Sequence, residues 1–304
     1  MSAAVAVGVF DGLHLGHLAI VERARARARE TGGRCVVLSF DPHPDLVLAK
    51  TFRALAPLTP LPERRERLAA LGAALEVLPF TRELAALSPE EFVERHLVAR
   101  FAPGWLVVGE DFALGRGRSG DVPRLRDIGA RHGFEVDAVP LARVDAEPVS
   151  STRARALLEA GDVAGAARLL GRRYRLAATV VRGEGIGRTL GFPTANLRLH
   201  HEQQVPAHGI YAVRVRLAGE SGWRAGAMSI GVRPTFGGQV PTLEVFVLDW
   251  DGDLVGRDLD VEFADWLRAE LKFESAAALV AAMTGDVAEV RRRLAGESRG
   301  GPGA

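Results

Sequence analysis

The chain has 304 residues, of which 47% are hydrophobic and 25% charged, a composition typical of a globular protein with room for two domains. A formal net charge of +1 gives no indication of a nucleic-acid or membrane partner. Cys35 is the only cysteine, which excludes an internal disulfide and a thiolate metal cluster. No apolar run approaches the ~18 residues of a membrane span. The amino terminus also lacks the basic region of a signal peptide, so we expect a cytoplasmic protein.

The first half of the chain alternates between predicted strands and helices. Strands are predicted at 5–10, 35–40, 75–80, 105–108 and 134–141, and helices at 15–29, 58–72 and 153–158. This alternation is typical of a doubly wound parallel sheet. Pro42 and Pro44 predict a stiff, extended loop after the second strand. The first predicted helix carries arginines at every second position from 23 to 29, which we interpret as a solvated face.

From Tyr174 onward the pattern changes to alternating segments separated by glycine and proline turns. Strands are predicted at 174–181, 209–217, 224–232, 242–250 and 259–267, and a final helix at 275–294. These segments suggest an antiparallel barrel or sandwich. We therefore expect two domains, 1–170 and 171–296, and a disordered tail at 297–304.

Residues 4–22, AVAVGVFDGLHLGHLAIVE, predict a strand, a tight turn and the start of a helix. Free N–H groups at a helix start favour phosphate, and Gly16 lets a ligand approach the main chain. His14 and His17 lie near each other on that turn and can donate to phosphate oxygens. We interpret the segment as a cradle for a nucleoside triphosphate. Half of a metal site, with His43 as a third ligand, and a pair of polar helix caps are the alternatives.

A second pattern suited to anions opens the helix at the end of the first half. Ser150, Ser151 and Thr152 offer hydroxyl and main-chain donors, and two arginines follow. Arg153 and Arg155 point to opposite sides of a helix, so we expect only one to face the ligand. An ordinary N-cap beside a solvated arginine is the alternative.

The second half carries its own set of candidate residues. Arg188 lies in a loop with four glycines: Gly183, Gly185, Gly187 and Gly191. Such a loop can close on phosphate, and a simple hairpin loop is the alternative. Thr194 and Asn196 offer hard oxygen ligands for Mg²⁺. Glu244 lies in an apolar strand, where a carboxylate is costly without a partner or a task, so it is the candidate general base. An outward-facing strand position is the alternative.

Together these segments resemble one family, the bifunctional riboflavin kinase/FMN adenylyltransferases (FAD synthetases) of bacteria. The matching segments of the first half are GVFDGLHLGH (8–17), SFDPHP (39–44), VVGEDFALGRGRSGD (107–121) and SSTRAR (150–155). Those of the second half are GEGIGRTLGFPTANL (183–197), GIYAV (209–213), IGVRPTFGG (230–238), LEVFVLDWDGDLVGRDLDVEF (243–263) and LRAELKF (267–273). Any one of them is modest, but all of them in the same order are specific.

For the first half, the resemblance implies a Rossmann-like nucleotidylyltransferase domain that transfers AMP from ATP to FMN and releases pyrophosphate. His14 and His17 would hold the phosphates, and Arg155 would grip the β/γ end. Other nucleotide contacts would come from Gly8, Phe10, Gly16, Asp111, Ser150, Ser151 and Thr152. The flavin would lie along Asp41, Pro42, His43 and Pro44. No protein nucleophile is needed, because the FMN phosphate attacks the α-phosphorus directly.

For the second half, the resemblance implies a riboflavin kinase domain, a small six-stranded antiparallel β-barrel with a C-terminal helix. It would move the γ-phosphoryl group of ATP onto the ribityl 5′-hydroxyl, with Glu244 as the base. Nucleotide and Mg²⁺ would be held by Thr194 and Asn196, and the nucleotide also by Gly183, Gly187 and Arg188. Arg268 and Phe273 would border the flavin. The expected partners are riboflavin, FMN and ATP, with no nucleic acid or membrane; self-association is left open.

The chain departs from the family pattern at Leu114, Ala154, Ala178, Phe246 and Val255, which bear on flavin fit and packing. Three other functions are the alternatives: a chain with one inactive half, a non-catalytic flavin sensor, and an HxGH adenylyltransferase for another acceptor. Intact His17, Arg155, Asn196 and Glu244 argue against an inactive half. The lack of a basic stripe argues against a regulator that binds DNA, and the predicted barrel argues against another acceptor.

Overall fold

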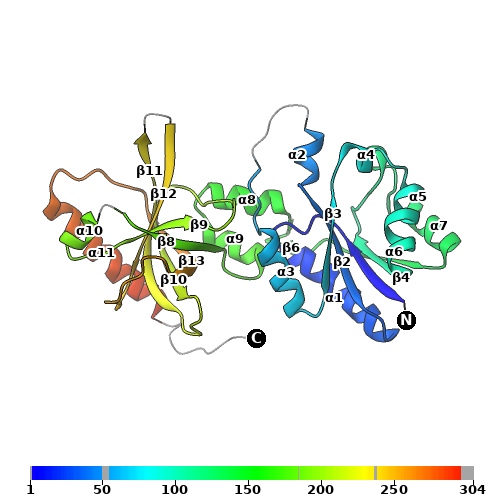
Figure 1. Ribbon diagram of the computed structural model, residues 1–304, viewed down its shortest axis with the longest axis horizontal. Coiled ribbons are helices and arrows are strands. Elements are labelled where there is room, and N and C mark those ends of the chain that lie inside the picture. Colours follow the sequence, from blue (N-terminus) through cyan, green and yellow to red (C-terminus); the bar gives the residue numbers. More distant parts are fainter. Residues whose placement is uncertain (1, 50–54, 184, 236–237, 296–304) are drawn as a thin grey trace. The chain divides into compact units, whose positions relative to one another are not determined.

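The computed structural model describes residues 2–49, 55–183, 185–235 and 238–295 (Figure 1). The tail predicted to be disordered, 297–304, lies outside this range. The chain divides into two compact units, Met1–Ser151 and Thr152–Ala304, which are described separately. No helix in the described ranges is both long and apolar enough to cross a membrane.

The first unit is built on a parallel five-stranded sheet with the order β3-β2-β1-β4-β5. Its strands are β1 (Ala3–Val7), β2 (Cys35–Asp41), β3 (Ala74–Pro79), β4 (Pro103–Gly109) and β5 (Glu135–Val139). The direction of winding reverses between β1 and β4. Ligands of such sheets bind at this switch point, outside the carboxyl ends of the strands. The predicted Rossmann-like sheet is therefore confirmed.

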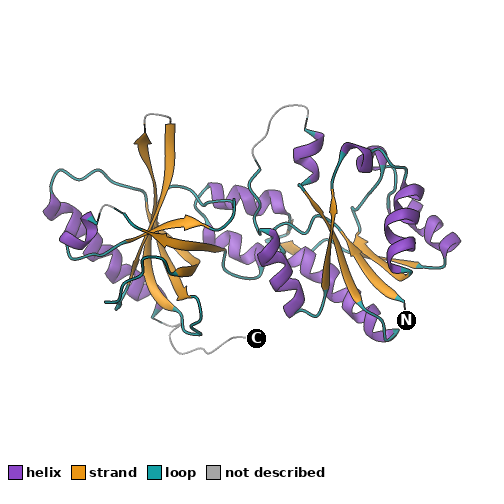
Figure 2. Ribbon diagram, viewed as in Figure 1, coloured by secondary structure: helices purple, strands orange, loops and turns teal. Residues whose placement is uncertain are grey.

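Helices cover both faces of this sheet (Figure 2). Alternate residues of β1 demonstrate the two layers, because Ala4 and Ala6 belong to one buried cluster and Val5 and Val7 to the other. The first cluster includes residues of α1 (Leu15–Glu30) and α3 (Leu61–Ala70). The second includes residues of α5 (Pro89–Phe92), the π-helical segment η1 (Val93–Val98), α6 (Ala99–Phe101) and α7 (Val122–His132). Shorter elements are α2 (Pro44–Leu48), α4 (Arg82–Ala85), η2 (Arg116–Arg118), β6 (Arg143–Val144) and β7 (Glu147–Pro148).

Two local predictions for the first unit are wrong. The first strand ends at Val7 instead of residue 10, and Phe10 has a φ of 54°, which is incompatible with extended backbone. The predicted extended loop ends at His43, because Pro44 begins helix α2. The ring of a proline fixes a φ that suits the first helical position, and His43 Nδ1 accepts a hydrogen bond from the Asp45 N–H at 3.1 Å.

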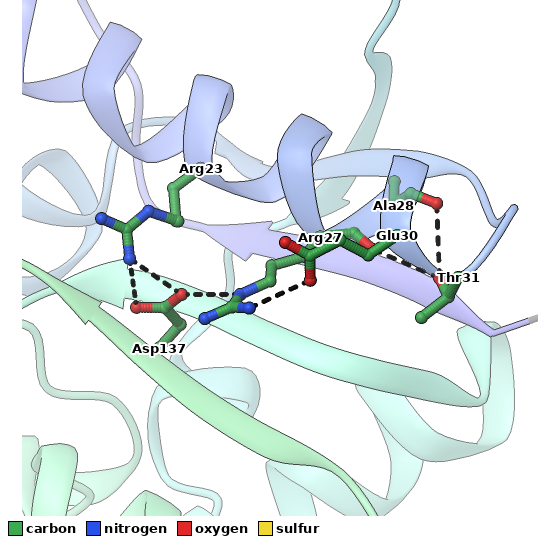
Figure 3. Close-up of polar contacts among 6 residues, drawn as sticks. All are labelled: Arg23, Arg27, Ala28, Glu30, Thr31 and Asp137. Atoms are coloured by element: carbon green, nitrogen blue, oxygen red, sulfur yellow. Dashed lines mark hydrogen bonds and ion pairs between the residues drawn. The ribbon is translucent and has the colours of Figure 1, made fainter.

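The arginines of α1 were predicted to be solvated, yet two of them join the helix to the sheet (Figure 3). Arg23 Nη1 donates to both oxygens of Asp137 in β5 at 3.1 Å, and Arg27 Nε donates to the same carboxylate at 3.0 Å. The Arg27 guanidinium also lies 3.9 Å from the ring centroid of Trp105 in β4. These contacts of Arg23 and Arg27 hold one face of α1 against β4 and β5. Arg25 and Arg29 instead pair with Glu22.

The second unit contains a closed antiparallel barrel with the order β10-β11-β12-β9-β8-β13, as predicted. Its strands are β8 (Arg175–Val181), β9 (Ala195–Leu199), β10 (Gly209–Leu217), β11 (Arg224–Thr235), β12 (Gly238–Val247) and β13 (Asp258–Arg268). The sequence pattern did not identify β9, whose five residues are too few to display a clear alternation.

Helices flank the barrel. Val290 and Leu294 of α11 (Ala276–Leu294) pack with Ala212 and Leu248 in a buried cluster outside the barrel core. Ser275 caps α11, since its Oγ accepts a hydrogen bond from the Ala278 N–H, so the predicted C-terminal helix is confirmed. The other helices of this unit are α8, which begins at Ser151 (Ser151–Glu159), α9 (Val163–Leu170) and α10 (Ile186–Thr189).

Candidate active sites

The loop after β1 has an unusual backbone that a buried carboxylate holds in place. Phe10 and Leu13 have φ angles of 54° and 43°, a left-handed conformation that costs free energy for residues with a side chain. Asp11 lies between them, and its carboxylate oxygens accept hydrogen bonds from the N–H groups of Leu58 and Thr59 at 3.1 and 3.0 Å. These contacts tie the loop to the segment that precedes α3.

A buried arginine completes this anchor. Arg64 is 4% exposed and lies 3.5 Å from the carboxylate of Asp11, which is 2% exposed. Arg64 Nη1 donates to the carbonyl oxygen of Val9 at 2.9 Å and to Ser39 Oγ at 3.1 Å. Burial lowers the pKa of Arg64, while the charges of Asp11 and Asp41 raise it. The pair therefore fixes the shape of the loop at the carboxyl ends of β1 and β2.

His14 and His17 meet at the start of α1, as the sequence predicted. Their rings are stacked, with centroids 3.6 Å apart and planes 14° apart. His14 is the N-cap, and its Nδ1 accepts a hydrogen bond from the His17 N–H at 3.3 Å. When neutral, His14 therefore carries its proton on Nε2. Phe10 supports the second ring, because the centroids of Phe10 and His17 are 5.1 Å apart.

The glycines predicted to contact nucleotide are closely surrounded. A Cβ at Gly16 would lie 3.2 Å from the His14 ring, and a Cβ at Gly8 would lie 3.2 Å from the Phe10 ring. Asp111 follows β4 on the other side of the switch point and is exposed. Gly8 and Asp111 thus lie in loops after β1 and β4, and Gly16 lies in the first turn of α1, all at the same edge of the sheet.

The serines at the end of the first unit and the arginine that follows them have separate surroundings. Ser151 Oγ donates a hydrogen bond to the carbonyl oxygen of Asp11 at 2.8 Å, so this hydroxyl helps to hold the loop after β1. Arg155 belongs to the second unit, is 8% exposed, and donates to Gln204 Oε1 at 3.4 Å. The roles of Ser150, Thr152 and Arg155 toward ATP stay predictions.

The predicted flavin-binding loop of the first unit lies at the carboxyl end of β2. Asp41 ends this strand, and His43 caps the short helix α2. Of the apolar residues in α2, Leu46 and Leu48 are exposed, at 39% and 50%. Across the described ranges, no three side chains of His, Cys, Asp or Glu are grouped so that they could hold a metal ion, which gives no support to a metal site that includes His43.

A cavity of about 350 Å³ lies on the outer side of the barrel in the second unit. Its polar lining includes Thr194, Asn196, Ser229, Glu244, Arg268, Glu270 and Asp286. Its apolar lining includes Ile210, Phe246, Leu271, Phe273 and Met283. The cavity thus combines polar and apolar side chains, as an amphipathic ligand requires.

Glu244 faces this cavity and not the barrel interior. Leu243 and Val245 on either side of it are buried in the barrel core, so alternation turns Glu244 outward. Its carboxylate accepts a hydrogen bond from Thr194 Oγ1 at 3.2 Å, and Asn196 is its direct partner in the ladder between β12 and β9. Glu244 therefore occupies the outward-facing position that the strand pattern allowed, and its role as the base stays a prediction.

The glycine loop is packed against the same polar residues. A Cβ at Gly183 would lie 2.0 Å from Asn196 Nδ2, and a Cβ at Gly187 would lie 2.3 Å from the carbonyl oxygen of Phe192 and 3.0 Å from Thr194 Oγ1. No side chain larger than hydrogen fits at either position without displacing these groups. The structure thus explains both glycines by close packing around Thr194 and Asn196.

Arg268 and Phe273, the predicted flavin contacts, both line the cavity, whereas Arg188 on α10 is exposed. Of the positions that depart from the family pattern, Leu114, Ala154 and Ala178 are buried and therefore affect packing. Phe246 forms part of the cavity wall, with its ring centroid 5.5 Å from that of Phe192. Val255 is 49% exposed.

Comparison with known proteins assigns the two units. The sequence model of the FAD synthetase family matches residues 1–153, and that of the riboflavin kinase family matches residues 170–294. A bifunctional riboflavin kinase/FMN adenylyltransferase of Pseudomonas fluorescens is 41% identical over 94% of this chain and 91% of its own length. The chain belongs to this family. The predicted pair of activities, riboflavin kinase and FMN adenylyltransferase, both of which use ATP, is thereby confirmed.

Other members of the bifunctional riboflavin kinase/FMN adenylyltransferase family cover most of the chain. Those of Listeria monocytogenes and Escherichia coli K12 are 36% and 37% identical over 94% and 88% of this chain, and over 91% and 85% of their own lengths. A crystal structure named as a macrolide-efflux protein of Streptococcus pneumoniae has a TM-score of 0.89 at 30% identity, over 95% of this chain and 94% of that one. That likeness supports the fold, and the efflux is said of that protein alone.

The boundary between the two activities stays a prediction. The two family matches leave residues 154–169 between them, and this interval holds most of α8 and all of α9 except its last residue. The compact units divide at residue 151, and the predicted boundary lies at residue 170. The helices between these positions carry Arg155, so their assignment matters for adenylyl transfer.

Proposed function

We propose that the outer cavity of the barrel phosphorylates riboflavin, and that the loop after β1 with the start of α1 adenylylates the resulting FMN. The observation that carries the first part is the meeting of Glu244, Thr194 and Asn196 in a cavity that is also lined by apolar side chains. The second part rests on the stacked His14 and His17 at the sheet's switch point.

The donor set in the barrel cavity fits Mg²⁺. A hydroxyl oxygen of Thr194 and an amide oxygen of Asn196 are hard ligands, and Mg²⁺ in such sites takes its remaining ligands from water and substrate phosphates. When bound there, Mg²⁺ would neutralise charge on the ATP phosphates. Removal of divalent cations with EDTA should stop both reactions, and excess Mg²⁺ should restore them.

In the kinase reaction, Glu244 would accept the proton of the ribityl 5′-hydroxyl as that oxygen attacks the γ-phosphorus and ADP leaves. The hydrogen bond from Thr194 at 3.2 Å fixes the direction of the carboxylate. The apolar lining residues, among them Ile210 and Met283, suit the ring system of a flavin. Gly183 and Gly187 let the backbone lie close to the side chains of Asn196 and Thr194.

In the adenylyl transfer, a phosphate oxygen of FMN attacks the α-phosphorus of ATP and pyrophosphate leaves. His14 would donate from Nε2, because its Nδ1 is used as the helix cap. His17 and the main-chain N–H groups at the start of α1 would hold the remaining phosphate oxygens.

Incubation of the purified chain with riboflavin, ATP and Mg²⁺ tests the proposal, with FMN and FAD followed by chromatography. The wild-type chain should form both products. Glu244→Gln should reduce FMN formation by at least about 100-fold while the conversion of added FMN to FAD continues, because only the first reaction needs this base. Normal phosphorylation by Glu244→Gln would refute the assignment of the base.

Because both reactions consume ATP, we also propose that the protein acts in the cytoplasm. Size-exclusion chromatography of the purified chain measures whether it self-associates.

A further inference from the structure

Arg268, the last residue of β13, is held by a carboxylate of α11. Its Nε donates to Asp286 Oδ1 at 2.8 Å and its Nη2 donates to Asp286 Oδ2 at 2.7 Å, so two parallel hydrogen bonds join the pair. Its Nη1 donates to the carbonyl oxygen of Ala269 at 3.0 Å. The side chains of Arg268 and Asp286 are only 24% and 12% exposed. A forked pair of this kind fixes the plane of the guanidinium group.

This pair also links the two elements that flank a segment lining the barrel cavity. Residues 269–275 lie between β13 and α11, and they supply Glu270, Leu271 and Phe273 to the lining. Phe273 lies beneath the fork, with its ring centroid 5.9 Å from the Arg268 guanidinium carbon. Glu270 lies against β11, where Ser229 Oγ donates to its carboxylate at 3.4 Å. This segment is thus attached to the barrel at Glu270 and to α11 through Asp286.

We propose that Asp286 is a positioning residue of the riboflavin kinase: it aligns Arg268 and the 269–275 segment so that the cavity accepts the flavin ring. Asp286 engages the edge that carries Nε and Nη2, and Ala269 accepts from Nη1, so a ligand would meet the flat face and the remaining N–H groups of the guanidinium group. A planar cation beside Phe273 suits the carbonyl oxygens and the face of an isoalloxazine ring. The inference rests on the proposed kinase function of this cavity.

Asp286→Asn tests it in the full-length chain. The substitution keeps the size of the side chain but removes the charge and one acceptor, so the fork is lost. The KM for riboflavin should rise about tenfold, the effect of one lost charge-assisted hydrogen bond, while kcat and the KM for ATP change by less than about threefold. Conversion of added FMN to FAD by the same sample should be unchanged, which reports that the first unit is folded, and the retained kcat for riboflavin reports the same for the barrel.

A second ion pair between the same elements provides the matched control. Arg293 of α11 pairs with Asp265 of β13, and neither lines the cavity, so Asp265→Asn should leave the KM for riboflavin unchanged. Arg268→Lys, which keeps the charge but not the fork, should raise this KM as Asp286→Asn does. The double variant should resemble either single variant, because both remove one interaction.

The outcomes separate this inference from the proposed function. A wild-type chain that forms no FMN contradicts the kinase assignment itself. A wild-type chain that forms FMN, together with an unchanged riboflavin KM in Asp286→Asn or in Arg268→Lys, overturns the role of Asp286 alone. Additive effects in the double variant, or an equal effect of Asp265→Asn, would mean that Asp286 only stabilises α11. If Asp286→Asn fails to fold, Arg268→Lys decides the question.

Discussion

At the scale of single residues, the buried ion pair between Asp11 and Arg64 shapes the first site although neither residue has a proposed role in the reaction. Asp11 and Arg64 are both almost fully buried and lie in the loop after β1 and in α3. Periodicity carries a signal for Arg64, because Leu61, Arg64 and Leu68 follow helical spacing and share one face of α3. Nothing in the spacing indicates that the partner is a residue 53 positions earlier.

Removing one member of this pair should destabilise the protein. Asp11→Asn leaves the Arg64 charge buried without its carboxylate, which should lower the free energy of unfolding by about 3–5 kcal/mol. Urea denaturation followed by circular dichroism measures the change. Glu94→Gln, which alters an exposed carboxylate of η1, is the control and should shift the free energy by less than about 0.5 kcal/mol. Equal values for the two variants would mean that the pair does not anchor the loop.

At the scale of elements, strand β9 decides how the kinase residues meet. The sequence indicated Thr194 and Asn196 as oxygen ligands and Glu244 as a base, but the pattern did not indicate that residues 195–199 form the sixth strand of the barrel. Pairing of β9 with β12 sets Asn196 opposite Glu244. Five residues are too short for a periodic signal, and the pairing arises only when the barrel closes.

The glycine loop before β9 should tolerate no side chain at Gly183. In Gly183→Ala, the new methyl group would collide with Asn196 Nδ2, so the amide or the loop must move. Since displacement of about 1 Å in a catalytic group can cost 100-fold, riboflavin phosphorylation should fall by about that factor while FMN adenylylation is retained. Gly222→Ala is the matched control, because a Cβ at Gly222 has no atom within 4 Å. Steady-state assays of both reactions on each variant make the comparison.

At the scale of the whole molecule, the chain combines two different folds that act in succession on flavins. Each candidate site is built from an edge that its own fold creates, the switch point of a parallel sheet and the outer wall of a closed barrel. FMN is the product of one reaction and the substrate of the other. The two activities should therefore separate when one site is inactivated.

Mixing two inactivated chains tests this separation. His17→Ala should convert riboflavin only as far as FMN, and Glu244→Gln should convert FMN but not riboflavin. An equimolar mixture should form FAD from riboflavin, because FMN released by the first variant can reach the second. Chromatographic assay of the mixture, with each variant alone as a control, measures the result. FAD formation by His17→Ala alone would contradict the assignment of this residue.

The sequence by itself determined the family, the two fold classes, and most of the strands and main helices, because these depend on motifs and on local apolar periodicity. It also indicated His14, His17, Thr194, Asn196 and Glu244 as the residues to find together. Only the tertiary structure decided that Glu244 faces an outer cavity, that Asp11 is matched to Arg64, and that Asp286 holds Arg268. Each of these facts joins residues that are far apart in the chain, and no local pattern records which distant side chain will share a buried space.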